Sequence, residues 1–274
     1  MLENRNPTIL EIMDMISNVD GATEQQKIDM KVNLFYKYIA WTDEDYQQYN
    51  KLLDELIKLK KQRVPIKSKK DRGTEKEATK KSIGDALEAV VDFIFEKSFF
   101  YKVYENKRTS THEIDQFVVL SDRGRQALED TKFTRDLLIT TQDYFLCECK
   151  NYKTPVSATW VGKFNTLLEI SGKCSVGLFF SCEGLTGKEN TWYDAHGLAK
   201  TIYRLSDDEE KRFILDITIK DLELLRSTDN NIFKIIKTKK ESMVSNIKSE
   251  NLYDTHEGYT EIKSIYKEIL HTQQ

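Results

Sequence analysis

The segment Asp143-Tyr144-Phe145-Leu146-Cys147-Glu148-Cys149-Lys150 decides the fold of this chain. It is rich in aromatic and apolar residues and follows a polar stretch, a pattern that predicts a β-strand. Strand side chains alternate between two faces, so Glu148 and Lys150 share one face, and Cys147 and Cys149 share the other. A buried strand accepts such charges when they are paired with each other or bind a metal. A carboxylate beside an ammonium group is suited to metal-assisted phosphodiester chemistry.

The segments around this strand alternate between helical and strand-like patterns, which predicts an α/β fold. Residues 82–97 carry an amphipathic stripe and are expected to form a helix capped by Ser82. Residues 121–142 contain Gly124 and many polar residues, so they are expected to form a polar insertion between two strands. Further strands are expected at 99–104, 111–120, 174–182 and 213–218, and further helices at 157–171 and 191–203.

The rest of the chain is predominantly polar with helical spacing of its apolar residues. Thr23 with Gln26, and Thr42 with Asp45, have the spacing of residues that cap helices at their N-termini. A lysine-rich stretch that follows is expected to be a solvated linker, and a loop that contacts the DNA backbone is the alternative. The expected divisions are a helical N-terminal region (1–65), the polar linker (66–81), an α/β domain (82–226) and a helical C-terminal tail (227–274).

The composition narrows the class of protein. Charged residues make up 32% of the chain and hydrophobic residues 39%, and the formal net charge is −3, so no global basic field indicates nucleic-acid binding. No apolar run approaches the roughly 20 residues that a membrane helix needs. The four cysteines lie in apolar, strand-like runs and are expected to be reduced core residues. These features predict a cytoplasmic protein without a membrane partner.

Three carboxylates and one lysine fall on neighbouring predicted elements: Glu88 on the helix, Asp115 on a strand, and Glu148 with Lys150 on the opening strand. Mg²⁺ prefers oxygen ligands, usually one or two carboxylates with water and substrate phosphate. A lysine beside it can offset the negative charge that develops during phosphodiester cleavage. Glu88 lies at the border of its apolar stripe, so an ordinary helix-surface charge is an alternative interpretation of this residue.

This arrangement resembles the PD-(D/E)xK nuclease superfamily, over about residues 82–225. The resemblance rests on Glu113-Ile114-Asp115, with isoleucine where the family name has proline, and on Glu148-Cys149-Lys150. Acid-any-lysine triplets occur elsewhere in the chain, but only this one lies in a strongly apolar strand between an acidic strand and another apolar strand. The chain is also similar to the branch of this superfamily that contains Mrr-type restriction enzymes and Holliday-junction resolvases. That similarity rests on three further stretches, Gly84-Asp85-Ala86-Leu87-Glu88, Val161-Gly162-Lys163-Phe164 and Val176-Gly177-Leu178-Phe179-Phe180.

The resemblance implies a restriction-endonuclease-like core of order αβββαβ, with a mixed central sheet flanked by helices and with helical extensions at both ends. It implies that Asp115 and Glu148 bind Mg²⁺ or Mn²⁺, that Lys150 is the catalytic lysine, and that Glu88 is an auxiliary metal ligand. The expected activity is that of a DNA endonuclease in a restriction or antiviral defence system.

Two alternatives remain open on the sequence. One is a catalytically inactive, nuclease-like subunit that binds DNA or scaffolds a larger complex, which the long helical flanks favour. The other is a nuclease of the same fold that cleaves RNA. The flanks are expected to join copies of the chain into a homo-oligomer or to dock a partner protein, for example an ATPase.

Overall fold

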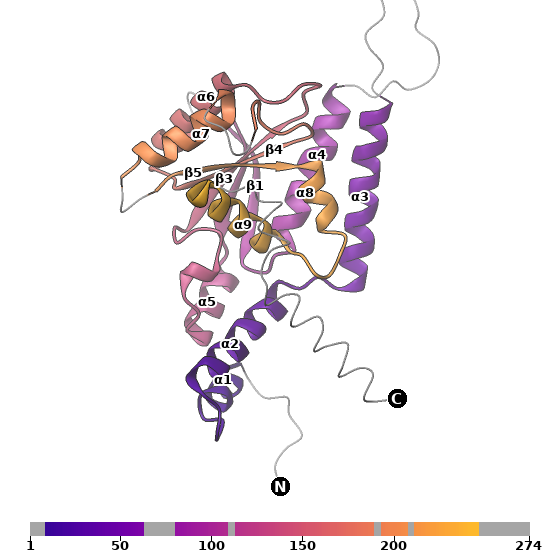
Figure 1. The fold of residues 1–274 in the computed structure, drawn as a ribbon. Helices are drawn as coiled ribbons and strands as arrows, with labels where there is room; N and C mark the ends of the chain where they lie inside the picture. Colours follow the sequence, from indigo (N-terminus) through magenta and orange to yellow (C-terminus); the bar gives the residue numbers. More distant parts are fainter. Residues whose placement is uncertain (1–8, 63–79, 109–112, 189–192, 208–210, 247–274) are drawn as a thin grey trace, which may run out of the picture.

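The computed structural model describes residues 9–62, 80–108, 113–188, 193–207 and 211–246, and shows an open, mixed five-stranded sheet flanked by helices (Figure 1). The strands lie in the order in which they occur in the chain: β1 (Tyr101–Arg108), β2 (Glu113–Leu120), β3 (Tyr144–Lys150), β4 (Val176–Ser181) and β5 (Phe213–Thr218). The helices are α1 (Ile9–Ser17), α2 (Glu24–Ile39), α3 (Asp43–Lys61), α4 (Lys80–Glu96), α5 (Asp122–Thr131), α6 (Ala158–Ile170), α7 (Asp194–Leu205), α8 (Ile219–Leu224) and α9 (Ile232–Ser245).

The sheet changes direction at its central strand. β1, β2 and β3 form an antiparallel meander, whereas β3, β4 and β5 run parallel to one another. Each parallel step needs a crossover, which α6 provides between β3 and β4 and α7 between β4 and β5. The residues of β4 are buried throughout, as expected for a parallel strand covered on both faces. The α/β class and the mixed sheet therefore agree with the sequence-based prediction.

Different helices cover the two faces of the sheet. Phe145 on β3 packs against Phe95 of α4, with 5.1 Å between the ring centroids. Phe179 on β4 points to the opposite face and packs against Phe164 of α6 at 4.6 Å. Gly177 permits this close approach, because a Cβ at that position would lie 2.6 Å from the Phe164 ring. We call these two sides the α4 face and the α6 face.

The α6 face is incompletely covered at the antiparallel end of the sheet. On β2, the residues directed to the α4 face, such as Gln116 and Val118, are buried. The alternate residues Asp115, Phe117 and Val119 are half-buried. The β2 side chains that point to the α6 face are therefore partly exposed to solvent.

The helices outside the expected α/β domain share its hydrophobic core. Phe35 of α2 packs against Phe100 with 5.3 Å between ring centroids, and against Phe233 of α9 at 5.8 Å. Tyr49 of α3 is fully buried and donates a hydrogen bond to the backbone oxygen of Leu222 at 2.7 Å. The predicted capping pairs at the starts of α2 and α3 are confirmed, each with both reciprocal hydrogen bonds.

The structure corrects two local predictions. Residues 121–142 are not merely a polar insertion, because α5 forms within them, capped by the Ser121 hydroxyl, and buries Ala127 and Leu128. The helix expected at 82–97 begins at Lys80, so Ser82 lies inside it and is not its cap. The helical spacing noted after residue 247 and most of the predicted linker lie outside the described residues. Among the helices that the structure describes, none has the length and apolar character to cross a bilayer.

Candidate active site

Asp115 and Glu148 come together where the pairing of β2 with β3 ends. The last paired residues are Gln116 and Cys147, so the next residue of each strand, Asp115 and Glu148, lies at a facing position and on the same side. The Cys149 amide donates a 2.8 Å hydrogen bond to Oδ2 of Asp115. A side-chain carboxylate therefore takes the role of a backbone acceptor at the point where the two strands separate.

Lys150 joins this pair of carboxylates. Its Nζ contacts Oε1 of Glu148 and lies 3.6 Å from Oδ2 of Asp115. The side chains of Asp115, Glu148 and Lys150 keep 17%, 12% and 16% of their surface exposed, so a substrate can reach them although they are largely buried. The structure thus brings three of the four sequence-predicted site residues to one point.

Burial and neighbouring negative charge both disfavour the ionised form of Glu148. Burial raises the pKa of Glu148 to about 7, with Asp115 and Glu88 adding repulsion that the Lys150 ammonium only partly offsets. Burial acts to lower the pKa of Lys150, but Glu148 and Asp115 outweigh it, so the pKa is raised and the lysine stays protonated. One lysine does not satisfy two carboxylates in this environment, and a further cation would relieve the repulsion.

Glu88, the fourth predicted residue, lies on α4 and is half-buried. Its backbone oxygen accepts a 3.0 Å hydrogen bond from Nε2 of Gln116, which fixes this turn of α4 against β2. Its carboxylate contributes to the raised pKa of Glu148, so its charge acts on the pair formed with Asp115. Glu88 is therefore an electrostatic neighbour of the site.

Asp92 and Gln116 form a polar pair on the α4 face, on the other side of the sheet from the Asp115 and Glu148 side chains, and this pair was not predicted. Burial raises the pKa of Asp92 to about 8, together with a hydrogen bond and repulsion from Glu105 and repulsion from Glu88. Nε2 of Gln116 donates to Oδ1 of Asp92 at 2.7 Å and favours its ionised form. The signal was present in the sequence, because Asp92 follows Glu88 by four residues and thus lies on the same side of the helix.

Aromatic side chains border Lys150 on the α6 face. Its Nζ lies 5.1 Å from the ring centroid of Trp160, and Nζ of Lys163 lies 4.6 Å from the same ring. Tyr152 extends this group, with its ring centroid 5.9 Å from that of Trp160. The sequence did not predict Trp160 at the site, because nothing in the spacing shows that α6 begins beside the end of β3.

The donor set fits a divalent cation held by two protein carboxylates. Within the ranges that the structure describes, no group of three or more His, Cys, Asp and Glu side chains is arranged to hold a metal ion. Mg²⁺ in proteins, however, is commonly held by one or two carboxylates, with water and substrate phosphate completing the shell. The convergence of Asp115 and Glu148 and the raised pKa of Glu148 are consistent with such a site.

Comparison with known proteins adds no relative, because no family model, no curated protein and no solved structure matches this chain.

Proposed function

We propose that this chain is a metal-dependent phosphodiesterase with a restriction-endonuclease-like core, and that its substrate is DNA. The observation that carries the proposal is the meeting of the Asp115 and Glu148 carboxylates at Nζ of Lys150. The element order supports it, since α4, β1, β2, β3, α6 and β4 follow the αβββαβ order expected for that core, with α5 inserted between β2 and β3. A role in restriction or antiviral defence is part of the proposal through the sequence resemblance alone.

A Mg²⁺ or Mn²⁺ ion held by Asp115 and Glu148 would supply a water of lowered pKa and positive charge beside the scissile phosphate. Side chains and one backbone amide of the chain would position the reacting groups. The Lys150 ammonium would meet a phosphate oxygen or orient the attacking water. The Cys149 amide holds the Asp115 carboxylate in place, and the Trp160 ring limits the directions open to Lys150.

The test is cleavage of plasmid and oligonucleotide DNA in the presence of Mg²⁺ or Mn²⁺. Glu148→Gln and Lys150→Met should each lower the rate by roughly 10²–10³-fold or more, because each removes charge stabilisation at the reacting phosphate. A matched control is the acid-any-lysine triplet at the C-terminal end of α5, where Asp130→Asn with Lys132→Met should leave the rate unchanged. Far-ultraviolet circular dichroism would establish that every variant is folded.

The same assay separates the alternatives. Cleavage of RNA but not DNA would replace the proposed substrate and keep the proposed chemistry. Absence of cleavage on duplex DNA, single-stranded DNA and RNA with every divalent cation tried would refute the enzyme and favour a non-catalytic, DNA-binding or scaffolding subunit.

A partner protein such as an ATPase, or a second copy of this chain, remains a prediction. The flanking helices offer surface for one, because Met15 on α1, and Ile28 and Met30 on α2, are exposed apolar residues. Light scattering with Met15→Glu and Ile28→Glu would show whether this surface holds an assembly together.

A further inference from the structure

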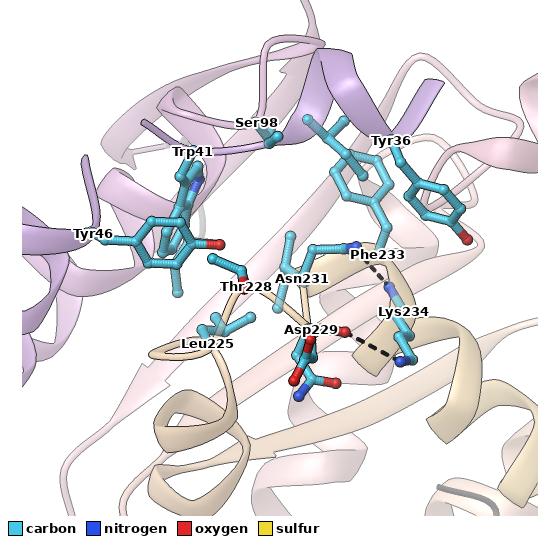
Figure 2. Close-up of a pocket in the computed structure, with 15 residues that line it drawn as sticks. Tyr36, Trp41, Tyr46, Ser98, Leu225, Thr228, Asp229, Asn231, Phe233 and Lys234 are labelled. Atoms are coloured by element: carbon cyan, nitrogen blue, oxygen red, sulfur yellow. Dashed lines mark hydrogen bonds between the residues drawn. The ribbon is translucent and has the colours of Figure 1, made fainter. Parts of the chain in front are cut away.

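The structure contains a cavity of about 380 Å³ that is lined by neither Asp115 nor Glu148. Figure 2 shows the residues that line it. Its lining comes from the α2–α3 corner, the end of α4, and the α8–α9 loop with the first turn of α9. Small-molecule sites in proteins typically enclose roughly 300–1,000 Å³, so this volume suits a ligand of modest size.

Aromatic rings form two of its walls. The rings of Trp41 and Tyr46 meet edge to face, with 5.4 Å between their centroids and 64° between their planes, and both are half-buried. Figure 2 shows Phe233 and Tyr36 on the other side of the cavity. A flat ligand between such walls would gain stacking contact on its faces.

The polar groups of the cavity come from the α8–α9 loop and from the α2–α3 corner. The side-chain amide of Asn230 and Nε1 of Trp41, both on half-buried residues, make no hydrogen bond to any residue that the structure describes, and neither does the Tyr46 hydroxyl. Burial and the nearby negative charge of Asp229 raise the pKa of Tyr46, so this hydroxyl and the Asp229 carboxylate share the cavity. Half-buried donors and acceptors of this kind are best satisfied by a ligand that carries polar atoms on its edge.

The charge of the cavity is balanced. Lys234 contributes one ammonium group, which donates a 3.2 Å hydrogen bond to the Asp229 backbone oxygen, and Asp229 contributes one carboxylate. The Lys234 amide is already bonded to the Asn231 side chain at 2.9 Å, as in a helix cap. The charged side chains that line the cavity therefore offer no surplus of positive charge with which to bind a phosphate group.

We propose that this cavity binds the base of a nucleoside or nucleotide, stacked on Trp41, bordered by the tilted ring of Tyr46, and read at its edge by Asn230 and Asp229. A nucleobase combines a flat aromatic body with alternating donors and acceptors, which is the combination that these walls and this edge accommodate. The inference does not rest on the proposed nuclease activity. The two sites nevertheless share a helix, since Ile94 of α4 lines the cavity and Glu88 lies six residues earlier, roughly 9 Å along the axis.

The test is titration of the full chain with adenosine, guanosine, cytidine and thymidine, followed by calorimetry and by tryptophan emission. The chain has three tryptophans, and stacking on Trp41 should quench part of the emission. At least one nucleoside should bind with a Kd below about 1 mM. Tyr46→Phe and Asn230→Ala should each weaken that binding about five- to tenfold, because each removes one hydrogen-bonding group and leaves the aromatic packing in place.

Controls assign the signal to this cavity. Trp160→Phe and Glu148→Gln alter the other site and should leave the Kd of the nucleoside unchanged. Mononucleotides and short single-stranded oligonucleotides show whether a free nucleoside, a nucleotide or the base of a nucleic acid is the better source of the ligand.

Three results would overturn the proposal. The first is the absence of binding by every nucleoside, nucleotide and oligonucleotide in the panel. The second is binding that Tyr46→Phe and Asn230→Ala leave unchanged. The third is equal affinity for indole, which would mean that the cavity accepts any flat apolar ring and does not read the edge of a base.

Discussion

Two clusters of buried charge lie on the same sheet, and each contains two carboxylates and a lysine. In the first, Asp115 and Glu148 meet Lys150. In the second, Lys239 of α9 lies 3.2 Å from Asp221 and 3.9 Å from Asp216 of β5. The strand register relates them, because Glu148 pairs with Phe179 and Phe179 pairs with Asp216, which places all three side chains on one face.

The clusters differ in how completely their charge is compensated. Burial raises the pKa of Asp216, but Lys239 and His196, whose Nε2 is 3.9 Å away, outweigh it and hold the pKa below its ordinary value. Asp221 also accepts the Thr218 amide at 2.7 Å. Glu148, in contrast, has a raised pKa of about 7. The direction of the pKa shift thus separates the two strand acids, Asp216 and Glu148, whereas burial and repulsion from Asp216 raise the pKa of Asp221 as well.

The largest expected effect is on the compensated cluster. Lys239→Met should lower the free energy of unfolding by about 3–5 kcal/mol, because it leaves two buried carboxylates without their ammonium group. Urea unfolding followed by circular dichroism measures this change. The exposed Lys237 on the same helix is the matched control, and Lys237→Met should change the stability by less than about 0.5 kcal/mol. Equal, small effects of the two variants would contradict the comparison.

Neutralising one acid in each cluster should change stability in opposite directions. Because the folded pKa of Glu148 is raised from 4.5 to about 7, its protonated form stabilises the fold at low pH, and this contribution is lost as the pH rises toward 7. At pH 8 without divalent cations, Glu148→Gln should therefore raise the unfolding free energy by about 1–3 kcal/mol, with little change at pH 5.

The ionisation of Asp216 has the opposite effect on the stability of the fold. Its pKa is lowered in the folded state, so its contribution is present above the unfolded pKa of 3.8 and is lost as the pH falls through the folded value. Asp216→Asn should lower the unfolding free energy at pH 8 by about 1–3 kcal/mol. Urea titrations of both variants at pH 5 and pH 8 test the two predictions. A loss of stability in Glu148→Gln at pH 8 would mean that the ionised Glu148 carboxylate does not destabilise the fold.

A divalent cation should stabilise the first cluster alone. Mg²⁺ or Mn²⁺ at ten times its Kd should add about 1.4 kcal/mol, which raises Tm by about 3–6 °C in a chain of this size. Asp216→Asn should show the same rise, whereas Asp115→Asn and Glu148→Gln should show none. Differential scanning fluorimetry against an EDTA baseline measures it, and a rise in Glu148→Gln as large as that of the unchanged chain would place the cation elsewhere.

The smallest effect concerns the ring beside Lys150. Trp160→Leu removes a cation–π contact that is worth about 0.5–1 kcal/mol at exposed sites, so the cleavage rate should fall about two- to fivefold. Lys163→Met removes the other cation over this ring, at an exposed position, and should have a smaller effect. Initial rates at saturating Mg²⁺ rank the two variants, and the reverse order would show that Lys163, and not the position of Lys150, matters for the substrate.

Local pattern predicted much of the fold. The period of two in the central strand and the apolar run of 213–218 gave strands whose observed limits differ by at most one residue. The capping pairs gave the starts of α2 and α3. The helix α5 was not predicted because it buries few apolar residues and its surface is charged. The helical spacing of its apolar residues is therefore hard to recognise in a polar segment.

The site was predictable in its residue types and not in its arrangement. Asp115 and Glu148 face each other only because β2 and β3 pair in one register, and α5 separates these strands in the chain. No local pattern fixes that register in advance. The partnership of Asp216 with Lys239 was missed for the same reason, since it depends on how α9 packs beside β5.

The hydrogen bond from the Cys149 amide to Asp115 has a practical consequence. A backbone proton bonded to a carboxylate resonates at a position that follows the charge of that carboxylate. The Cys149 signal in a ¹H–¹⁵N spectrum would thus serve as an internal probe, shifting when an ion or a proton reaches Asp115, before any substrate is known.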